Sequence, residues 1–97
     1  MTADFHPLAA AELTDAAVFY EGQASGLGGD FLDEIDRLVA VLCVYPDIGR
    51  EHPDDIRSMP TRRFPYTVVY QVLGDRLLVL AVAHQRREPR YWAGRTR

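Results

Sequence analysis

Lysine is absent from this sequence, cysteine occurs only once, and no hydrophobic run is long. The single cysteine, Cys43, excludes an internal disulfide and any metal cluster built on cysteines. The longest apolar run, residues 38–45, falls far short of the ~18 to 20 residues that a membrane-spanning helix needs. The first residues, MTADFHP, contain neither a cationic start nor a long apolar stretch, so no secretory signal is indicated. These absences predict a cytoplasmic protein without a membrane span.

Metal and cofactor motifs are also missing. The three histidines, His6, His52 and His84, show no spacing typical of metal ligands. The glycines at 26, 28 and 29 follow a helical pattern rather than a strand, so they form neither a phosphate loop nor a dinucleotide fingerprint. We therefore predict no metal and no cofactor. The 97 residues contain no repeat and no linker, which predicts a single domain over residues 1–97.

Charge is distributed very unevenly along the chain. Residues 1–56 carry twelve acidic side chains and two arginines, whereas residues 57–97 carry nine arginines and two acidic side chains. Such asymmetry predicts a basic face that meets an anionic partner, either nucleic acid or an acidic peptide. The alternative is a solvated surface on which the arginines are scattered without function.

Hydrophobic spacing predicts two helices in the first half of the chain. The first begins at Pro7, which suits the first turn of a helix, and ends near Gly22. A glycine-rich turn follows, and Asp30 is the expected N-cap of the second helix. Its expected apolar stripe ends before Pro46 and consists of Phe31, Ile35, Leu38, Leu42 and Tyr45.

From Ile56 onward the spacing is typical of strands. Residues 56–64 form a weak strand interrupted by Pro60, and residues 66–73 and 76–84 form strong strands around a Gly74–Asp75 turn. Counting back from that turn predicts four cross-strand pairs: Val72 with Leu77, Tyr70 with Val79, Val68 with Ala81, and Tyr66 with Ala83. The predicted fold class is α+β, a helical hairpin followed by an antiparallel sheet and a short C-terminal tail or helix.

The candidate site lies after the last strand. Arg86 and Arg87 are interpreted as an anion clamp, with Arg62 and Arg63 expected nearby because they precede the neighbouring strand. A solvated strand end is the alternative. His84, placed by alternation on the face of Leu78, Leu80 and Val82, is either a general base or a residue that hydrogen-bonds the backbone.

Two aromatic residues follow these arginines. Tyr91 and Trp92 either stack on bases or on a partner's arginine, or pack the tail onto the sheet. The full set predicted to bind a target or partner is Arg62, Arg63, Arg86, Arg87, Arg90, Tyr91 and Trp92.

The segments RRFPYTVVYQV and LLVLAVAHQRR, together with the helical hairpin GLGGDFLDEIDRL, resemble the RelE/ParE toxin superfamily of type II toxin-antitoxin systems. The resemblance extends over nearly the whole chain. It implies a short N-terminal strand, a sheet packed against two helices, and a cognate antitoxin that neutralises the toxin in a hetero-oligomer.

The two branches of the superfamily imply different mechanisms. In the RelE branch the toxin cleaves mRNA on the ribosome, and an ungapped alignment on VYQV places its functional positions on Ser58, Pro60, Thr67, Arg87 and Ala93. Of these only Arg87 matches, and Tyr91 lies two residues from the expected tyrosine. A nuclease needs both a base and cations to hold the phosphate, so these substitutions argue against an enzyme.

The chain is more similar to the ParE branch, which implies growth inhibition by binding DNA gyrase, a role in plasmid stabilization, and no catalysis by the toxin. The main alternative is a ribosome-dependent endoribonuclease, with candidate residues Arg62, Arg63, Arg86, Arg87, Tyr91 and His84. A further alternative is an inactive or orphan module that only binds a partner.

Overall fold

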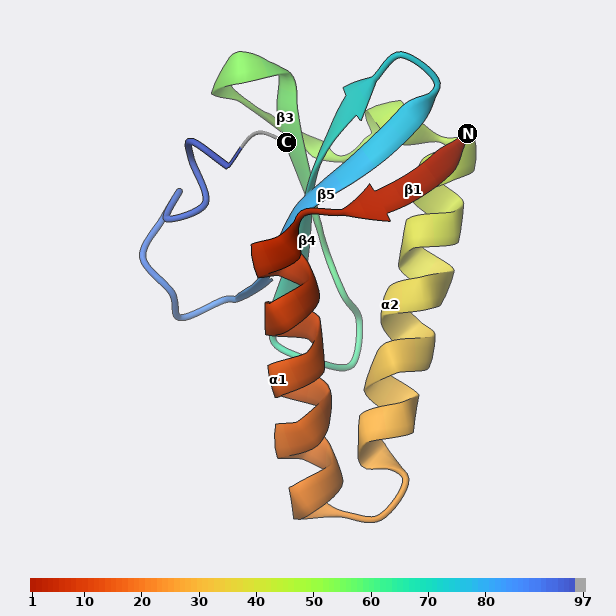
Figure 1. The fold of residues 1–97 in the computed structure, drawn as a ribbon, viewed down its shortest axis with the longest axis vertical. Coiled ribbons are helices and arrows are strands. Elements are labelled where there is room, and N and C mark those ends of the chain that lie inside the picture. The colour runs from red at the N-terminus through yellow and green to blue at the C-terminus, as the bar shows by residue number, and fades with distance from the viewer. Residues whose placement is uncertain (96–97) are drawn as a thin grey trace.

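The computed structural model describes residues 1–95, which form two helices packed on one face of a five-stranded sheet (Figure 1). Short 3-10 turns occur at Pro46–Ile48 and Pro53–Asp55. The main elements are β1 (Thr2–Phe5), α1 (Pro7–Gln23), α2 (Leu27–Val44), β2 (Arg50–His52), β3 (Ile56–Pro60), β4 (Tyr66–Leu73) and β5 (Arg76–His84). None of the helices in this range is both long and apolar enough to cross a membrane.

The strand order is β1-β5-β4-β3-β2, with antiparallel pairing from β2 through β5. β1 pairs with β5 in parallel, which makes the sheet mixed. Both helices and the other three strands lie between β1 and β5 in the chain. Two parallel neighbouring strands require a long connection of this kind. The structure confirms the α+β prediction, including the N-terminal strand that the resemblance implied.

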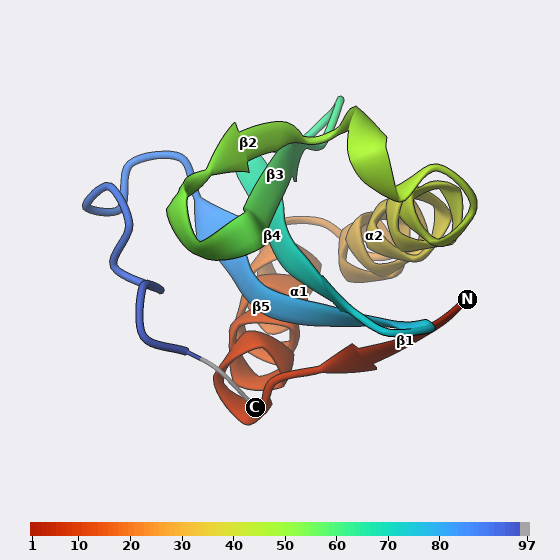
Figure 2. The same cartoon turned by 90° about the horizontal axis from the view of Figure 1, so that it is seen from above.

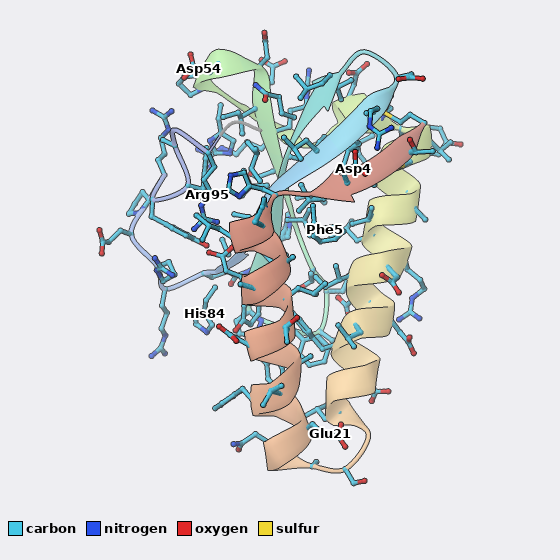
Figure 3. The ribbon with its side chains drawn as sticks, viewed as in Figure 1. Asp4, Phe5, Glu21, Asp54, His84 and Arg95 are labelled. Carbon is cyan, nitrogen blue, oxygen red and sulfur yellow. The ribbon has the colours of Figure 1, made fainter. Side chains whose placement is uncertain are left out.

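The helical hairpin closes tightly, but not as the sequence suggested. α2 begins after Gly26, which has a φ of 87°, so the prediction that Asp30 is the N-cap was wrong. Instead Glu21, at the end of α1, accepts hydrogen bonds from the backbone N–H groups of Gly26 (2.9 Å) and Gly28 (3.0 Å) (Figure 3). A Cβ on Gly28 would lie 2.5 Å from the carbonyl oxygen of Ala17, so this glycine allows the two helices to approach closely.

The main core lies between the helices and the sheet. Three of the five residues in the predicted α2 stripe, Phe31, Ile35 and Leu42, are fully buried, and Leu38 is half-buried. The prediction for Tyr45 was wrong: it terminates the helix and is 61% exposed, while Val39 is buried on the core-facing side. The sheet contributes Val68, Tyr70, Leu77, Val79 and Val82 to the same cluster.

A β-bulge changes the register of the β4–β5 hairpin. The pairs nearest the turn, Val72 with Leu77 and Tyr70 with Val79, are confirmed. Beyond them Val69 pairs with Ala81, so Leu80 is the extra residue of β5. The predicted partners of Val68 and Tyr66 were therefore wrong by one residue, since they pair with Val82 and His84.

The bulge also switches the side on which β5 residues project. Before it, Leu77 and Val79 face the helices, whereas after it Val82 joins that core and Ala81 and Ala83 belong to a second cluster. His84 lies two residues after Val82 and pairs with Tyr66, so the prediction that it shares a face with Leu78, Leu80 and Val82 was right for Val82 and wrong for Leu78 and Leu80. A one-residue shift exchanges the two faces because side chains alternate with a period of two.

Candidate functional site

Beyond β5 the chain returns across the sheet face opposite the helices (Figure 2). This C-terminal segment, residues 85–95, consists of turns, so of the two predicted forms it is a tail rather than a helix. Trp92 anchors the tail: its side chain is 4% exposed and packs with Ile56, Val69 and Leu80 in the second hydrophobic cluster. Of the two interpretations of Trp92, packing against the sheet is the one that the structure shows.

Glu12 of α1 holds the end of the tail. Its carboxylate accepts hydrogen bonds from the Tyr91 hydroxyl (2.9 Å) and from both terminal nitrogens of Arg95 (2.9 and 3.0 Å). It also accepts one from the backbone N–H of Val82 (3.0 Å), while Arg95 donates to the carbonyl of Leu80 (3.1 Å). Figure 3 shows Arg95 on the tail beside α1.

These contacts satisfy an otherwise open strand edge. β1 pairs with β5 only as far as the Phe5–Val79 pair, so the outer edge of β5 continues without a strand partner. The Glu12 carboxylate and the Arg95 guanidinium provide the acceptor and the donor that a neighbouring strand would have supplied. We refer to Glu12, Tyr91 and Arg95 as the tail clamp.

Tyr91 is constrained by this arrangement. Burial raises its pKa to about 12, and the hydrogen bond to Glu12 acts in the same direction. The hydroxyl is therefore protonated near neutral pH and donates to Glu12. The Arg87 guanidinium stacks on the Tyr91 ring, 3.8 Å from its centroid, so the ring positions an arginine.

A cleft of about 440 Å³ lies between the tail and the sheet, and we call it the sheet-face cleft. Three arginines line it: Arg50 from β2, and Arg87 and Arg90 from the tail. Arg90 forms a long ion pair with Asp54 (3.9 Å) on an exposed surface, and it has a positive φ of 59°. The cleft thus combines several cations with a partly apolar floor.

Within the cleft, His52 Nε2 and Ser58 Oγ lie 2.7 Å apart and form a hydrogen bond. Burial lowers the pKa of His52, and the positive charges of Arg50 and Arg90 add to that effect. Sequence reasoning missed Arg50 and His52, because a three-residue strand is too short to show a period. Only its pairing with β3 brings them to the cleft.

Arg62 and Arg63 occupy a different place from Arg87. Their backbone N–H groups donate to the buried carboxylate of Glu34 on α2, at 2.5 and 3.0 Å, and Arg63 forms an ion pair with Asp30 (3.7 Å). They line a groove beside α2 and do not contribute to the sheet-face cleft. The predicted cluster of four arginines is therefore divided between two surfaces.

His84 and Arg86 organise the start of the tail. The Nδ1 atom of His84 accepts a hydrogen bond from the backbone N–H of Arg86 (3.0 Å), and its ring contacts the edge of Tyr66 at 5.1 Å between centroids. This geometry matches the interpretation in which His84 hydrogen-bonds the backbone. The side chain of Arg86 is exposed. Across residues 1–95, no three histidine, cysteine or acidic side chains gather closely enough to hold a metal ion.

Most of the chain matches a known protein family. Residues 3–89 match the model of the ParE toxin of the type II toxin-antitoxin system parDE. The chain belongs to the ParE toxin family. This confirms the resemblance to the RelE/ParE superfamily and its assignment to the ParE branch. The match ends at residue 89, so Tyr91, Trp92 and Arg95 lie beyond it.

A solved structure with the same fold comes from a chromosomal ParDE toxin-antitoxin system of P. aeruginosa. The two chains are 18% identical and superpose with a TM-score of 0.62 over 87% of this chain and 95% of the other. At that identity the similarity shows a shared fold. No curated protein sequence matches this ParE chain significantly.

Three of the positions that align with RelE-type functional residues lie in the sheet-face cleft of this ParE toxin: Ser58, Thr67 and Arg87. Two of them carry neutral side chains where that branch has cations. The hydroxyl of the nearby Tyr91 donates a hydrogen bond to Glu12.

Proposed function

We propose that this ParE toxin arrests growth by binding DNA gyrase and that a cognate antitoxin neutralises it. The observation that carries the proposal is the composition of the sheet-face cleft. Ser58 and Thr67 stand where a RelE-type nuclease needs cations, and the Tyr91 hydroxyl donates a hydrogen bond to the Glu12 carboxylate. Cleavage at a ribose 2′-hydroxyl requires a base and cations that hold the phosphate, and among the positions that align with the RelE branch only Arg87 supplies such a group.

Arg86, Arg87 and Arg90 are the residues that we propose for contact with the target. All three have exposed side chains on a tail that is fixed at its end by the tail clamp. Tyr91 and Trp92 support this surface: the Tyr91 ring lies against Arg87, and the buried Trp92 holds the segment to the sheet. Arginine suits such a surface because its planar group forms paired hydrogen bonds with carboxylates.

Antitoxin binding is supported by the uneven charge of the chain. An antitoxin segment that folds on binding can place acidic side chains against the arginines that follow residue 56. Attraction of this kind mainly raises the association rate. We expect association of toxin with antitoxin to slow as salt is raised, and a rate independent of salt would contradict this part of the proposal.

Purified toxin tests the gyrase proposal directly. We expect it to inhibit supercoiling by gyrase or to accumulate cleavage complexes, and we expect Arg87→Ala combined with Arg90→Ala to reduce the effect. Arg76→Ala is the matched control, because Arg76 is exposed and pairs with Asp4 on the opposite edge of the sheet. Growth arrest with unaffected gyrase would refute the proposed target.

Two further experiments, controlled expression and toeprinting, distinguish the alternatives. Controlled expression, followed by separate measurement of DNA and protein synthesis, should show that DNA synthesis stops first. Cuts in A-site codons by toeprinting, lost on Arg87→Ala, would instead identify a ribosome-dependent nuclease. Expression without any growth defect would favour an orphan partner-binding module.

A further inference from the structure

The sheet-face cleft holds more positive charge than the protein itself neutralises. Three arginines and one acid, Glu88, line it, so the lining carries a formal charge of +2 when histidine is counted as neutral. Across residues 1–95, no carboxylate lies within 4.0 Å of the guanidinium of Arg50 or Arg87. Arg90 has one long ion pair, at 3.9 Å, with the exposed Asp54. The cleft therefore presents cations to an incoming anion.

The pairing of β2 with β3 places the polar groups of the cleft on one face of the sheet. Arg50 lies directly opposite Ser58 in this antiparallel pair, and His52 follows two residues after Arg50. Residues opposed across such a pair, and residues two apart in one strand, project from the same face. Ile56, the partner of His52, belongs to the second hydrophobic cluster, so this face is the one opposite the helices. The register thus delivers all three polar side chains to the cleft.

Aromatic rings of the tail hold the other two arginines in place. The guanidinium carbon of Arg90 lies 5.7 Å from the centroid of the Trp92 ring, and the Arg87 guanidinium lies 3.8 Å from that of the Tyr91 ring. Trp92 is buried, and the Tyr91 hydroxyl is bonded within the tail clamp, so both rings are fixed. The arginines are therefore positioned before a ligand arrives, which lowers the entropy cost of binding one.

His52 lies where these charges meet. Its ring packs against Trp92 with 5.3 Å between the centroids, and its Nε2 atom is hydrogen-bonded to Ser58 Oγ at 2.7 Å. Besides burial, the positive charges of Arg50 and Arg90 lower the pKa of His52. These two arginines come from different segments and act on one imidazole, so their charges converge at this point of the cleft.

From this convergence we infer that the sheet-face cleft binds a phosphate monoester, carried by a free nucleotide or by the end of a nucleic-acid strand. Arg50, Arg87 and Arg90 neutralise its charge through charge-assisted hydrogen bonds. Neutral His52 donates its Nε2 proton to Ser58 Oγ, which leaves the Ser58 hydroxyl proton for a phosphate oxygen.

The charge of the lining favours a monoester over other anions. A phosphate monoester carries about −1.5 to −2 charges near neutral pH and offers three strong acceptor oxygens. That charge matches the +2 of the lining. A carboxylate and an internal phosphodiester each carry a single negative charge, so either would leave about half of the positive charge without a counter-charge.

Phosphate binding goes beyond the proposed function, because it does not require gyrase to be the target. Arg87 and Arg90 belong to both surfaces, whereas Arg50, His52 and Ser58 were not proposed as target contacts. The binding measurements contain no gyrase, and the gyrase assay contains no added phosphate monoester beyond the nucleotide that gyrase itself uses. Either proposal can therefore fail without the other.

The test uses the full chain at constant ionic strength, with the emission of its single tryptophan as the reporter. Trp92 contacts both His52 and Arg90, so a ligand in the cleft should change its emission. We expect a saturable change with inorganic phosphate and with a nucleoside 5′-monophosphate. Acetate and the unphosphorylated nucleoside at the same concentrations should produce none, and an equal response to acetate would overturn the preference for phosphate.

Variants locate the response. Arg50→Gln should weaken binding of the nucleoside monophosphate by about tenfold or more, and adding Arg90→Gln should abolish it. Arg37→Gln is the matched control, because Arg37 is exposed on α2, lies outside the cleft and has no ion pair to the described residues. It should bind within about twofold of the wild type. Equal affinity of Arg50→Gln and Arg37→Gln would refute the site.

Histidine ring signals in NMR spectra give a second readout, which nonspecific association of ions would not move. Saturating phosphate should raise the pKa of His52, because the bound anion offsets the charges of Arg50 and Arg90. The ring signals of His6, at the start of α1 and outside the cleft, should not respond. A rise of the same size in Arg50→Gln would contradict the proposed contacts.

Oligonucleotides distinguish the two sources of the phosphate. A DNA hexamer with a 5′-phosphate that binds more tightly than the nucleotide identifies the strand end as the source, and weaker binding identifies the free nucleotide. Equal binding of hexamers with and without the terminal phosphate would overturn the inference, since internal phosphodiesters would then suffice. Cleavage of an RNA hexamer would assign the cleft to a nuclease instead. No response to either phosphate or nucleotide would also overturn it and leave the gyrase proposal standing.

Discussion

Glu12→Gln tests whether the tail clamp holds the C-terminal segment on the sheet. Glu12 receives hydrogen bonds from the Val82 backbone, the Tyr91 hydroxyl and both terminal nitrogens of Arg95. Its side chain is 18% exposed and that of Arg95 is 14% exposed. Glutamine keeps the size of the side chain but removes the charge and turns an amide donor toward the guanidinium. The substitution therefore leaves a largely buried arginine without its counter-charge.

The expected cost follows from this burial. Breaking a buried ion pair by removing one partner costs roughly 3 to 5 kcal/mol, and the residual exposure of both side chains points to the lower end, about 3 kcal/mol. In a domain of this size each kcal/mol corresponds to several degrees, so the melting temperature should fall by about 15 °C. We also expect the tail to loosen before the rest of the domain unfolds.

The single tryptophan makes the measurement specific. Trp92 is buried under the tail, so a red shift of its emission reports detachment of the tail, while far-UV circular dichroism reports the helices. Guanidinium titrations with both probes give the free energy of unfolding. Asp15→Asn is the matched control, because Asp15 is exposed on the same helix and has no hydrogen bond or ion pair to the described residues.

A double-mutant cycle with Arg95→Gln isolates the pair and should give a coupling energy of at least about 1 kcal/mol. The reasoning would be refuted if Glu12→Gln matched Asp15→Asn within about 0.5 kcal/mol and Trp92 emission did not change. The tail would then be held by the packing of Trp92 alone.

Three further predictions concern other parts of the structure. Because burial raises the pKa of Tyr91 to about 12, the folded chain keeps a proton that the unfolded chain loses near pH 10. The unfolding free energy should therefore fall between about pH 10 and 12 more steeply in the wild type than in Tyr91→Phe; parallel profiles would contradict this. Glu34→Gln should cost about 1.5 to 3 kcal/mol in chemical denaturation, since a buried charged acceptor of two N–H groups is lost; a loss below 0.5 kcal/mol would show that the turn is held otherwise. Gly49→Ala should lower the melting temperature, because the added Cβ would collide with the buried Tyr70 hydroxyl, and Tyr70→Phe should relieve part of that loss in the double variant; additive effects would show that the collision is not the cause.

Local patterns in the sequence determined most of the framework. Pro7, the apolar spacing and Pro46 located both helices, and alternation around Gly74 and Asp75 gave the bounds of β4 and β5 without error. These elements depend on neighbours within a few residues along the chain. The sequence therefore contains the information that sets them.

The candidate site was predicted only in part, because some of its residues are brought together by contacts between segments that are distant in the sequence. The arginine-rich tail was found from composition, and the structure places Arg87 and Arg90 at one cleft. The contribution of β2 was not found, because three residues carry no periodic signal. The split between Arg62 and Arg87 was missed because a backbone contact with Glu34 on α2, not proximity in the hairpin, positions the β3–β4 turn.

The tertiary structure alone decided two features: the bulge at Leu80 and the hydrogen-bond partners of Glu12 and Glu34. Strict alternation cannot reveal an extra residue, yet that residue moves His84 to the other face of the sheet. Glu12 bonds to residues 70 to 83 positions away, and Glu34 to residues 28 and 29 positions away. Both look like ordinary surface acids in an amphipathic helix, and only the packed fold supplies the donors that give them a role.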